Sequence, residues 1–223
     1  MSMNRLSQFT ALNKLELLEL AIPGDYPDIA VALSALGSMK IGFGTHVKLN
    51  IAAGTYNHTS QISIPQNIRS LELNGTAVVD LNWSGAPAGT NGIYCTYPRL
   101  RFLVNDVWFT GTNTGVGLVA SWGSFLELNG CGFSSWTNGA SLSMSCYGYI
   151  NNCTIYNCYR GFNFTDNSRG EVRNSNWSQV TFAVATWRNT SIYAQGNVAG
   201  GGTHASYYLS PIHGNYGCYY HVV

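Results

Sequence analysis

The sequence predicts an all-β fold: a single-stranded parallel β-helix of about six coils, preceded by a short N-terminal helical segment. The pentapeptide LELNG occurs twice, at residues 71–75 and again at residues 126–130. Both copies open an eight-residue row whose pattern recurs, with rows starting at residues 71, 102, 126, 148 and 170 and a weaker one near Ile192. Repetition at a nearly constant period is typical of a solenoid, because each unit buries its apolar face only by stacking on its neighbours.

Within a row, the first and third positions are apolar or Gly, which predicts a strand with one inward face. The fourth and fifth positions are mostly Asn, Asp and Gly, which tolerate left-handed backbone angles and indicate a bend. After the bend, the sixth and eighth positions are expected to point inward, as Thr76 and Val78 in the first row. Because stacked coils lie about 4.8 Å apart, the third positions should form a single file of Leu73, Val104, Leu128, Ile150 and Val172.

Residues 1–24 are expected to form a helical anchor or cap. Apolar residues spaced by three suggest one helical face, which Pro23-Gly24 would end; they are Leu6, Phe9, Leu12, Leu15 and Leu18. A second helix is indicated between Pro27 and Gly37 by Ile29, Leu33 and Leu36. Residues 25–198 would then form the β-helix, and residues 199–223 a Tyr/His-rich, uncharged tip or closing segment.

Composition narrows the function classes. Charged residues make up 9% of the chain, against about 25% in typical domains. The net charge of +1 gives no electrostatic argument for nucleic-acid binding, and no apolar run approaches the roughly 18 residues of a membrane span. The six cysteines contain no CxxC pair, so the preferred interpretation is buried, reduced thiols rather than a zinc site. No cofactor is expected.

The stretch ALSALGSMKIGFGTHVKLNIAAGTYNHTSQISIP, followed by LELNG, resembles the opening of right-handed β-helices of the pectin-lyase-like superfamily. The short helix, the AAGTY turn and the low charge are most similar to bacteriophage tail fibres and tailspikes, over roughly residues 30–198. The resemblance implies a homotrimer located in the virion, and outside the cell after particle release. It also implies an N-terminal segment that contacts other tail proteins and a distal end that contacts host surface polysaccharide.

Two carboxylates are the candidates for catalysis. Glu127 and Glu171 share one outward column with Glu72, and Tyr149 lies between them. They are two coils apart, roughly 9.6 Å, at the upper edge of the separation expected for inverting glycoside hydrolysis. The competing interpretation is a pair of solvated surface acids. No cluster of acids within one coil suggests a metal site.

The candidate ligand-binding residues lie in the tail, which has no Asp, Glu, Lys or Arg after Ser191. Tyrosine combines a broad apolar ring with a polar tip, which suits sugar contact and protein interfaces alike; the candidates are Tyr207, Tyr208, Tyr216, Tyr219 and Tyr220. The alternative is that these residues only close the last coil. Trp136 and Trp187 are expected to be exposed and to line a glycan groove.

These features lead to a structural and adhesive phage virion protein, a tail-fibre or tailspike-like arm that contacts host glycan or neighbouring virion proteins. The alternative is a polysaccharide depolymerase, a lyase or glycoside hydrolase acting on bacterial surface glycan. A third possibility is a purely connecting piece of the virion.

Overall fold

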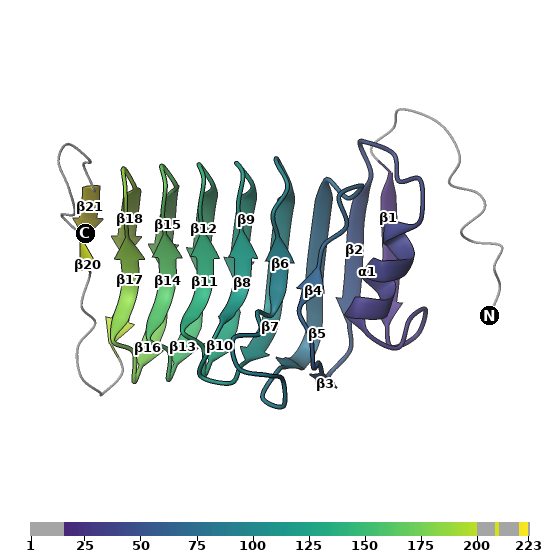
Figure 1. Cartoon of the computed structure of the whole chain (residues 1–223), viewed down its shortest axis with the longest axis horizontal. Coiled ribbons are helices and arrows are strands. Elements are labelled where there is room, and N and C mark those ends of the chain that lie inside the picture. Colours follow the sequence, from purple (N-terminus) through teal and green to yellow (C-terminus); the bar gives the residue numbers. More distant parts are fainter. Residues whose placement is uncertain (1–15, 200–207, 210–218, 223) are drawn as a thin grey trace.

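The structure is a computed structural model that describes residues 16–199, 208–209 and 219–222. These residues form a parallel β-solenoid of about six turns with one short helix. Figure 1 shows the turns side by side along the long axis, running from α1 (Ile29–Gly37) at one end to β21 (Tyr219–Val222) at the other. The predicted all-β parallel solenoid is confirmed.

The turns that follow α1 contribute strands to three faces, and all neighbouring strands pair in parallel. The first face stacks β1 (Leu17–Ile22), β2 (His46–Ile51), β5 (Ser70–Asn82), β7 (Arg101–Thr110), β9 (Phe125–Asn129), β12 (Tyr147–Asn151), β15 (Arg169–Arg173), β18 (Ser191–Gln195) and β21. The second face stacks β3 (Gly54–Asn57), the ends of β5 and β7, β10 (Gly132–Ser134), β13 (Thr154–Tyr156), β16 (Asn176–Ser178) and β19 (Val198–Ala199). The third face stacks β4 (Ile62–Ser63), β6 (Ile93–Cys95), β8 (Val116–Ala120), β11 (Asn138–Leu142), β14 (Arg160–Phe164), β17 (Phe182–Thr186) and β20 (Tyr208–Leu209).

The strand register confirms the predicted rows. The first positions pair in the order Leu71, Phe102, Leu126, Gly148, Gly170 and Ile192. The third positions form one buried file of Leu73, Val104, Leu128, Ile150 and Val172. Along every strand, the side chains of this file alternate with side chains that point outward. The first face therefore has one side toward the core and one side toward solvent.

The bend between the first and second faces also follows the prediction. Asp106, Gly130, Asn152 and Asn174 all have φ between 49° and 63° and occupy equivalent positions on successive turns. Asn and Asp tolerate this left-handed conformation better than most residues, and Gly adopts it without steric cost. Just before the bend, side-chain amides connect turns, as when Asn129 Nδ2 donates to Asn105 Oδ1 over 3.2 Å.

The first row departs from the predicted pattern after its bend. Thr76 and Val78 were expected inside, but both are exposed, Val78 at 84%. The register shifts between Asn74 and Val79, so that Val79 pairs with Val107. Alignment of the rows from their first positions missed this insertion, because the extra residues bulge out of the turn without changing the apolar pattern on either side.

The cysteines pack as predicted in the part of the chain that the structure describes. Cys95, Cys131, Cys146, Cys153 and Cys158 are all free and buried. Burial raises the pKa of the Cys153 thiol and raises that of Cys158 to about 11. The thiols of Cys153 and Cys158 therefore remain protonated, and the five buried cysteines act as small apolar core residues.

The expected N-terminal helix is wrong for residues 17–22, which form β1. Leu18, Leu20 and Ile22 are buried, whereas the residues between them are exposed. This alternation by two fits a strand, and β2 offers its backbone as a parallel partner for the whole of β1. Residues 1–15, on which the anchor hypothesis also rests, lie outside the described residues.

The second predicted helix is confirmed as α1. Asp28 caps its N-terminus, since Oδ1 accepts a hydrogen bond from Val31 N over 2.9 Å. The apolar face, with Ile29, Leu33 and Leu36, joins the same buried core as the first turns. Because α1 lies at the N-terminal end of the solenoid (Figure 1), it covers core that an open end would expose to water. No helix among the described residues has the length and apolar character to cross a membrane.

Candidate functional site

The candidate site is the outer side of the first face, where the side chains not used by the core project into solvent. The register places Glu72, Leu103, Glu127, Tyr149, Glu171 and Tyr193 in one outward column. Glu127 and Glu171 are thus two strands apart with Tyr149 between them, as their spacing in the sequence indicated.

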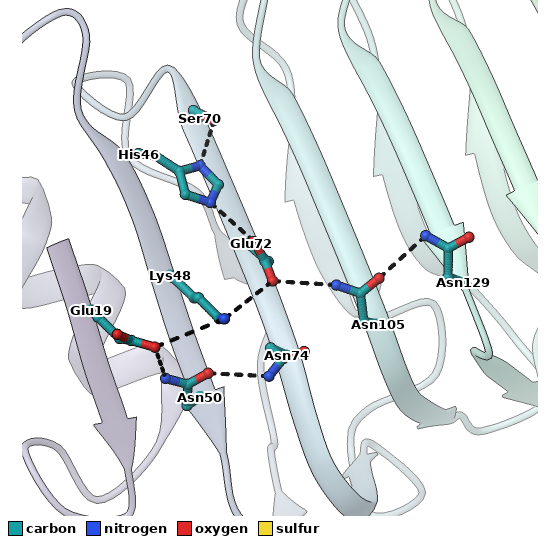
Figure 2. A network of polar contacts seen from close by, with 9 residues as sticks. All are labelled: Glu19, His46, Lys48, Asn50, Ser70, Glu72, Asn74, Asn105 and Asn129. Atoms are coloured by element: carbon teal, nitrogen blue, oxygen red, sulfur yellow. Dashed lines mark hydrogen bonds and ion pairs between the residues drawn. The ribbon is translucent and has the colours of Figure 1, made fainter. Parts of the chain in front are cut away.

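The N-terminal part of this surface is a polar network (Figure 2). Glu72 lies at its centre: Oε2 is 3.0 Å from His46 Nε2, and Oε1 is 3.8 Å from Lys48 Nζ. Glu19 Oε1 is 3.8 Å from the same Lys48 Nζ and accepts a hydrogen bond of 2.6 Å from Asn50 Nδ2. These contacts connect β1, β2 and β5, so the carboxylates are engaged in joining turns.

Farther along the solenoid, the same surface becomes aromatic. Arg173 lies with its Cζ 5.9 Å from the ring centroid of Tyr149 and 5.4 Å from that of Tyr193. Its Nη2 is 2.6 Å from Glu171 Oε2, which holds the guanidinium in place. We call Tyr149, Glu171, Arg173 and Tyr193 the tyrosine–arginine cluster; it spans β12, β15 and β18.

Glu171 has partners on both carboxylate oxygens. Besides the ion pair with Arg173, Oε1 accepts a hydrogen bond of 3.2 Å from Tyr147 Oη. Burial, and next the negative charge of Glu171, raise the pKa of Tyr147, so its hydroxyl keeps the proton that it donates. Glu127 Oε1 accepts a hydrogen bond of 3.2 Å from Asn129 Nδ2.

This arrangement suits binding better than acid–base catalysis. A general acid and a general base need free access to the scissile bond. Here Tyr149 occupies the position between the two carboxylates, and Glu171 is held by two neighbours. Tyrosine rings, a guanidinium and a carboxylate on one surface can instead contact the apolar faces and hydroxyl groups of a sugar.

The tail tyrosines are only partly placed. Tyr208 belongs to β20, and Tyr219 and Tyr220 belong to β21, which pairs with β18. These strands add to the third and first faces, in the manner of a closing segment. Tyr207 and Tyr216 lie outside the described residues, and a ligand-binding role for the five tyrosines stays a prediction.

The expectation that Trp136 is exposed is wrong. Only 1% of it is exposed, and its Nε1 donates to Phe109 O over 3.0 Å inside the core. Its neighbours along the chain, Ser135 and Thr137, are polar and gave no sign of burial. Trp187 is half-buried and lines a shallow hollow with Arg160 and Asn163 on the third face.

Sequence reasoning missed Arg173, Tyr147 and Tyr193 as site residues. The signal that marks them is their place in the rows: Arg173 occupies the fourth position, where most rows have Asn, and Tyr193 extends the Glu/Tyr column to the last row. Among the described residues, no group of three or more His, Cys, Asp or Glu side chains is placed to hold a metal ion. Comparisons with protein-family models, curated proteins and solved structures find no match to this chain.

Proposed function

We propose that this chain is the rigid, glycan-contacting arm of a tail-fibre or tailspike-like phage protein and that it works as a homotrimer. The observation that carries the glycan contact is the tyrosine–arginine cluster on the outer side of β12, β15 and β18. The phage origin and the trimer rest on the sequence resemblance, and residues 1–15 are the segment proposed to meet other virion proteins.

The solenoid suits an arm because each turn is hydrogen-bonded to the next along all three faces. Buried files of side chains and amide contacts such as Asn74 Nδ2 to Asn50 Oδ1, 3.1 Å, connect the same turns. Bending such a rod would break many of these contacts together, because each turn depends on its neighbours. A rigid rod can hold a binding surface at a set distance from its attachment point.

The glycan contact is tested on the full chain with a microarray of bacterial surface polysaccharides. Tyr149→Ala and Tyr193→Ala should each weaken binding about tenfold, since each removes an aromatic ring beside Arg173. Tyr156→Ala is the matched control, because Tyr156 is 44% exposed but lies on the second face. Unchanged binding in both cluster variants, or equal loss in the control, would contradict this proposal.

Light scattering of the purified chain tests the trimer, and a monomeric mass would exclude it for the isolated chain.

The alternative, depolymerase activity, is favoured by one observation: Glu127 and Glu171 share a column at a separation that inverting hydrolysis permits. It is tested by assaying release of oligosaccharide from any polysaccharide that binds. Release that Glu127→Gln or Glu171→Gln abolishes, with binding retained, would establish an enzyme in place of an adhesive arm.

A further inference from the structure

A second outward column lies beside the tyrosine–arginine cluster, two residues earlier on each strand. It consists of Arg101 on β7, Phe125 on β9, Tyr147 on β12 and Arg169 on β15, paired in that order. The rings of Phe125 and Tyr147 are stacked, with centroids 5.6 Å apart and planes 4° apart. Two exposed arginines therefore flank a stacked aromatic pair. We call these four residues the arginine–aromatic ladder.

A hollow opens at one end of this ladder. It is lined by Arg99, Leu100, Arg101, Gly123 and Phe125, where β7 and β9 begin. Arg99, which lines the hollow, and Trp122, whose O accepts a hydrogen bond from Arg99 N, have φ of 66° and 62°, a conformation that bulky residues rarely adopt. The same conformation recurs at the corner of the next turns, at Met144 and Asp166, so it belongs to the repeat; Trp122 is 53% exposed despite its size.

The charge of this surface is positive and unpaired. Arg99, Arg101 and Arg169 form no ion pair within residues 16–199. The neighbouring outward column carries three carboxylates: Glu72 is paired with Lys48, Glu171 is paired with Arg173 and hydrogen-bonded by Tyr147, and Glu127 accepts a hydrogen bond from Asn129. Stacking covers one side of each ring and leaves ring edges open, and the edge is the electropositive part of an aromatic ring. Guanidinium groups and ring edges together attract an anion.

We propose that the arginine–aromatic ladder binds an anionic saccharide chain that lies along the solenoid axis, across the strands. Arg101 and Arg169 are separated by three strand spacings, about 14 Å. Each guanidinium can hold a carboxylate or phosphate with two parallel hydrogen bonds. The sugar between these two anionic groups lies over Phe125 and Tyr147, and Arg99 in the hollow takes a further anionic group. This inference rests on the proposed glycan contact and names its chemical class.

The test is calorimetric titration of the full chain with hyaluronan oligosaccharides, which carry carboxylates, and with phosphomannan oligosaccharides, which carry phosphates. Carboxyl-reduced hyaluronan has the same backbone without the charges. We expect at least one of the two anionic chains to bind, the neutral chain to bind at least about tenfold more weakly, and rising salt to weaken the anionic binding. Whichever of the two binds shows whether the anionic group of the saccharide is a carboxylate or a phosphate.

Variants of the ladder sharpen the test. Arg101→Ala with Arg169→Ala should lower the affinity at least about tenfold, and Arg101→Lys should lower it less, because the charge is kept while the planar fork is lost. Arg188→Ala removes the same charge from a side chain that is 74% exposed and outside the ladder, and should have no effect. The melting temperature of each variant checks that the solenoid is intact.

Four results would overturn the inference. They are equal binding of charged and carboxyl-reduced hyaluronan, an undiminished affinity in the double variant, tighter binding of single-stranded DNA than of either anionic saccharide, and absence of binding to both anionic chains. The glycan contact itself would survive these results if the polysaccharide microarray still shows binding that depends on Tyr149 and Tyr193.

Discussion

Single residues at the corners set the shape of each turn. Asn152 and Asn174 occupy left-handed positions that their side chains tolerate, whereas Trp122 and Met144 hold similar angles without that advantage. Both of these bulky residues are exposed, so burial of their side chains does not offset the strain. The local preference of Asn, Asp and Gly for left-handed backbone angles therefore explains the corners that contain them. It does not explain the corners with Trp or Met.

His58 shows how one buried residue makes stability depend on pH. It is 8% exposed, its ring lies 4.9 Å from that of Trp83, and its Nε2 has no hydrogen-bond partner among the residues that the structure describes. Burial lowers the pKa of His58, and the charge of Asp28 opposes this only in part. The unfolded chain therefore binds the proton more readily than the folded one.

Stability should fall as the pH drops through about 6.5, the usual pKa of His, toward the lower pKa of the folded state. His58→Phe keeps an aromatic ring beside Trp83 but cannot titrate. We expect the melting temperature of the native chain to fall more between pH 7 and pH 5 than that of His58→Phe. Parallel curves for the two proteins would show that His58 is not the group responsible.

At the scale of elements, neighbours decide between helix and strand near the N-terminus. Leu15 and Leu18 fit a helical spacing, but Leu18 and Leu20 also fit a strand, and pairing with β2 satisfies the backbone of β1 along its length. α1 forms where apolar residues recur at helical spacing and Asp28 caps the first turn. The helix at the end of the solenoid is thus residues 29–37.

The cap of α1 offers a direct test. Asp28→Ala removes the acceptor for Val31 N and should cost about 1 kcal/mol, which lowers the melting temperature by about 2–4 °C for a chain of this size. Ser34→Ala, at an exposed position within the same helix, is the control and should change it little. An equal loss in both variants would mean that the helix, and not its cap, is sensitive to substitution.

For the molecule as far as the structure describes it, the core holds the turns together through apolar files and free thiols rather than through disulfides. Phe109 and Phe133 on successive turns stack with centroids 4.9 Å apart, and the described cysteines fill positions in the same interior. The outer side of the first face changes along the axis, from a polar network around Glu72 to the aromatic residues beyond β9. The polar network joins β1, β2 and β5, and the aromatic part farther along the axis is the surface that we propose to bind a glycan.

The thiols test the core as a whole. In a Cys218→Ser background, which removes the cysteine outside the described residues, the native protein should react only slowly with a thiol reagent, because the remaining thiols are buried. After unfolding in guanidinium without reductant, all five should react. Fewer than five would reveal disulfides, and rapid labelling of the native protein would contradict the packing of the interior.

The sequence by itself determined the repeat, the rows and the inward file from Leu73 to Val172, because these depend on alternation along a strand and on a period that local residues define. It also placed Glu127, Tyr149 and Glu171 in one column. Only the tertiary structure decided that Glu171 is held by Tyr147 and Arg173 and that residues 17–22 form a strand. It also showed that residues 76–78 bulge out of the first row and that Trp136 is buried. Each of these depends on which side chain of a neighbouring turn fills the available space. The sequence of one row does not show which residues of the next turn will contact it.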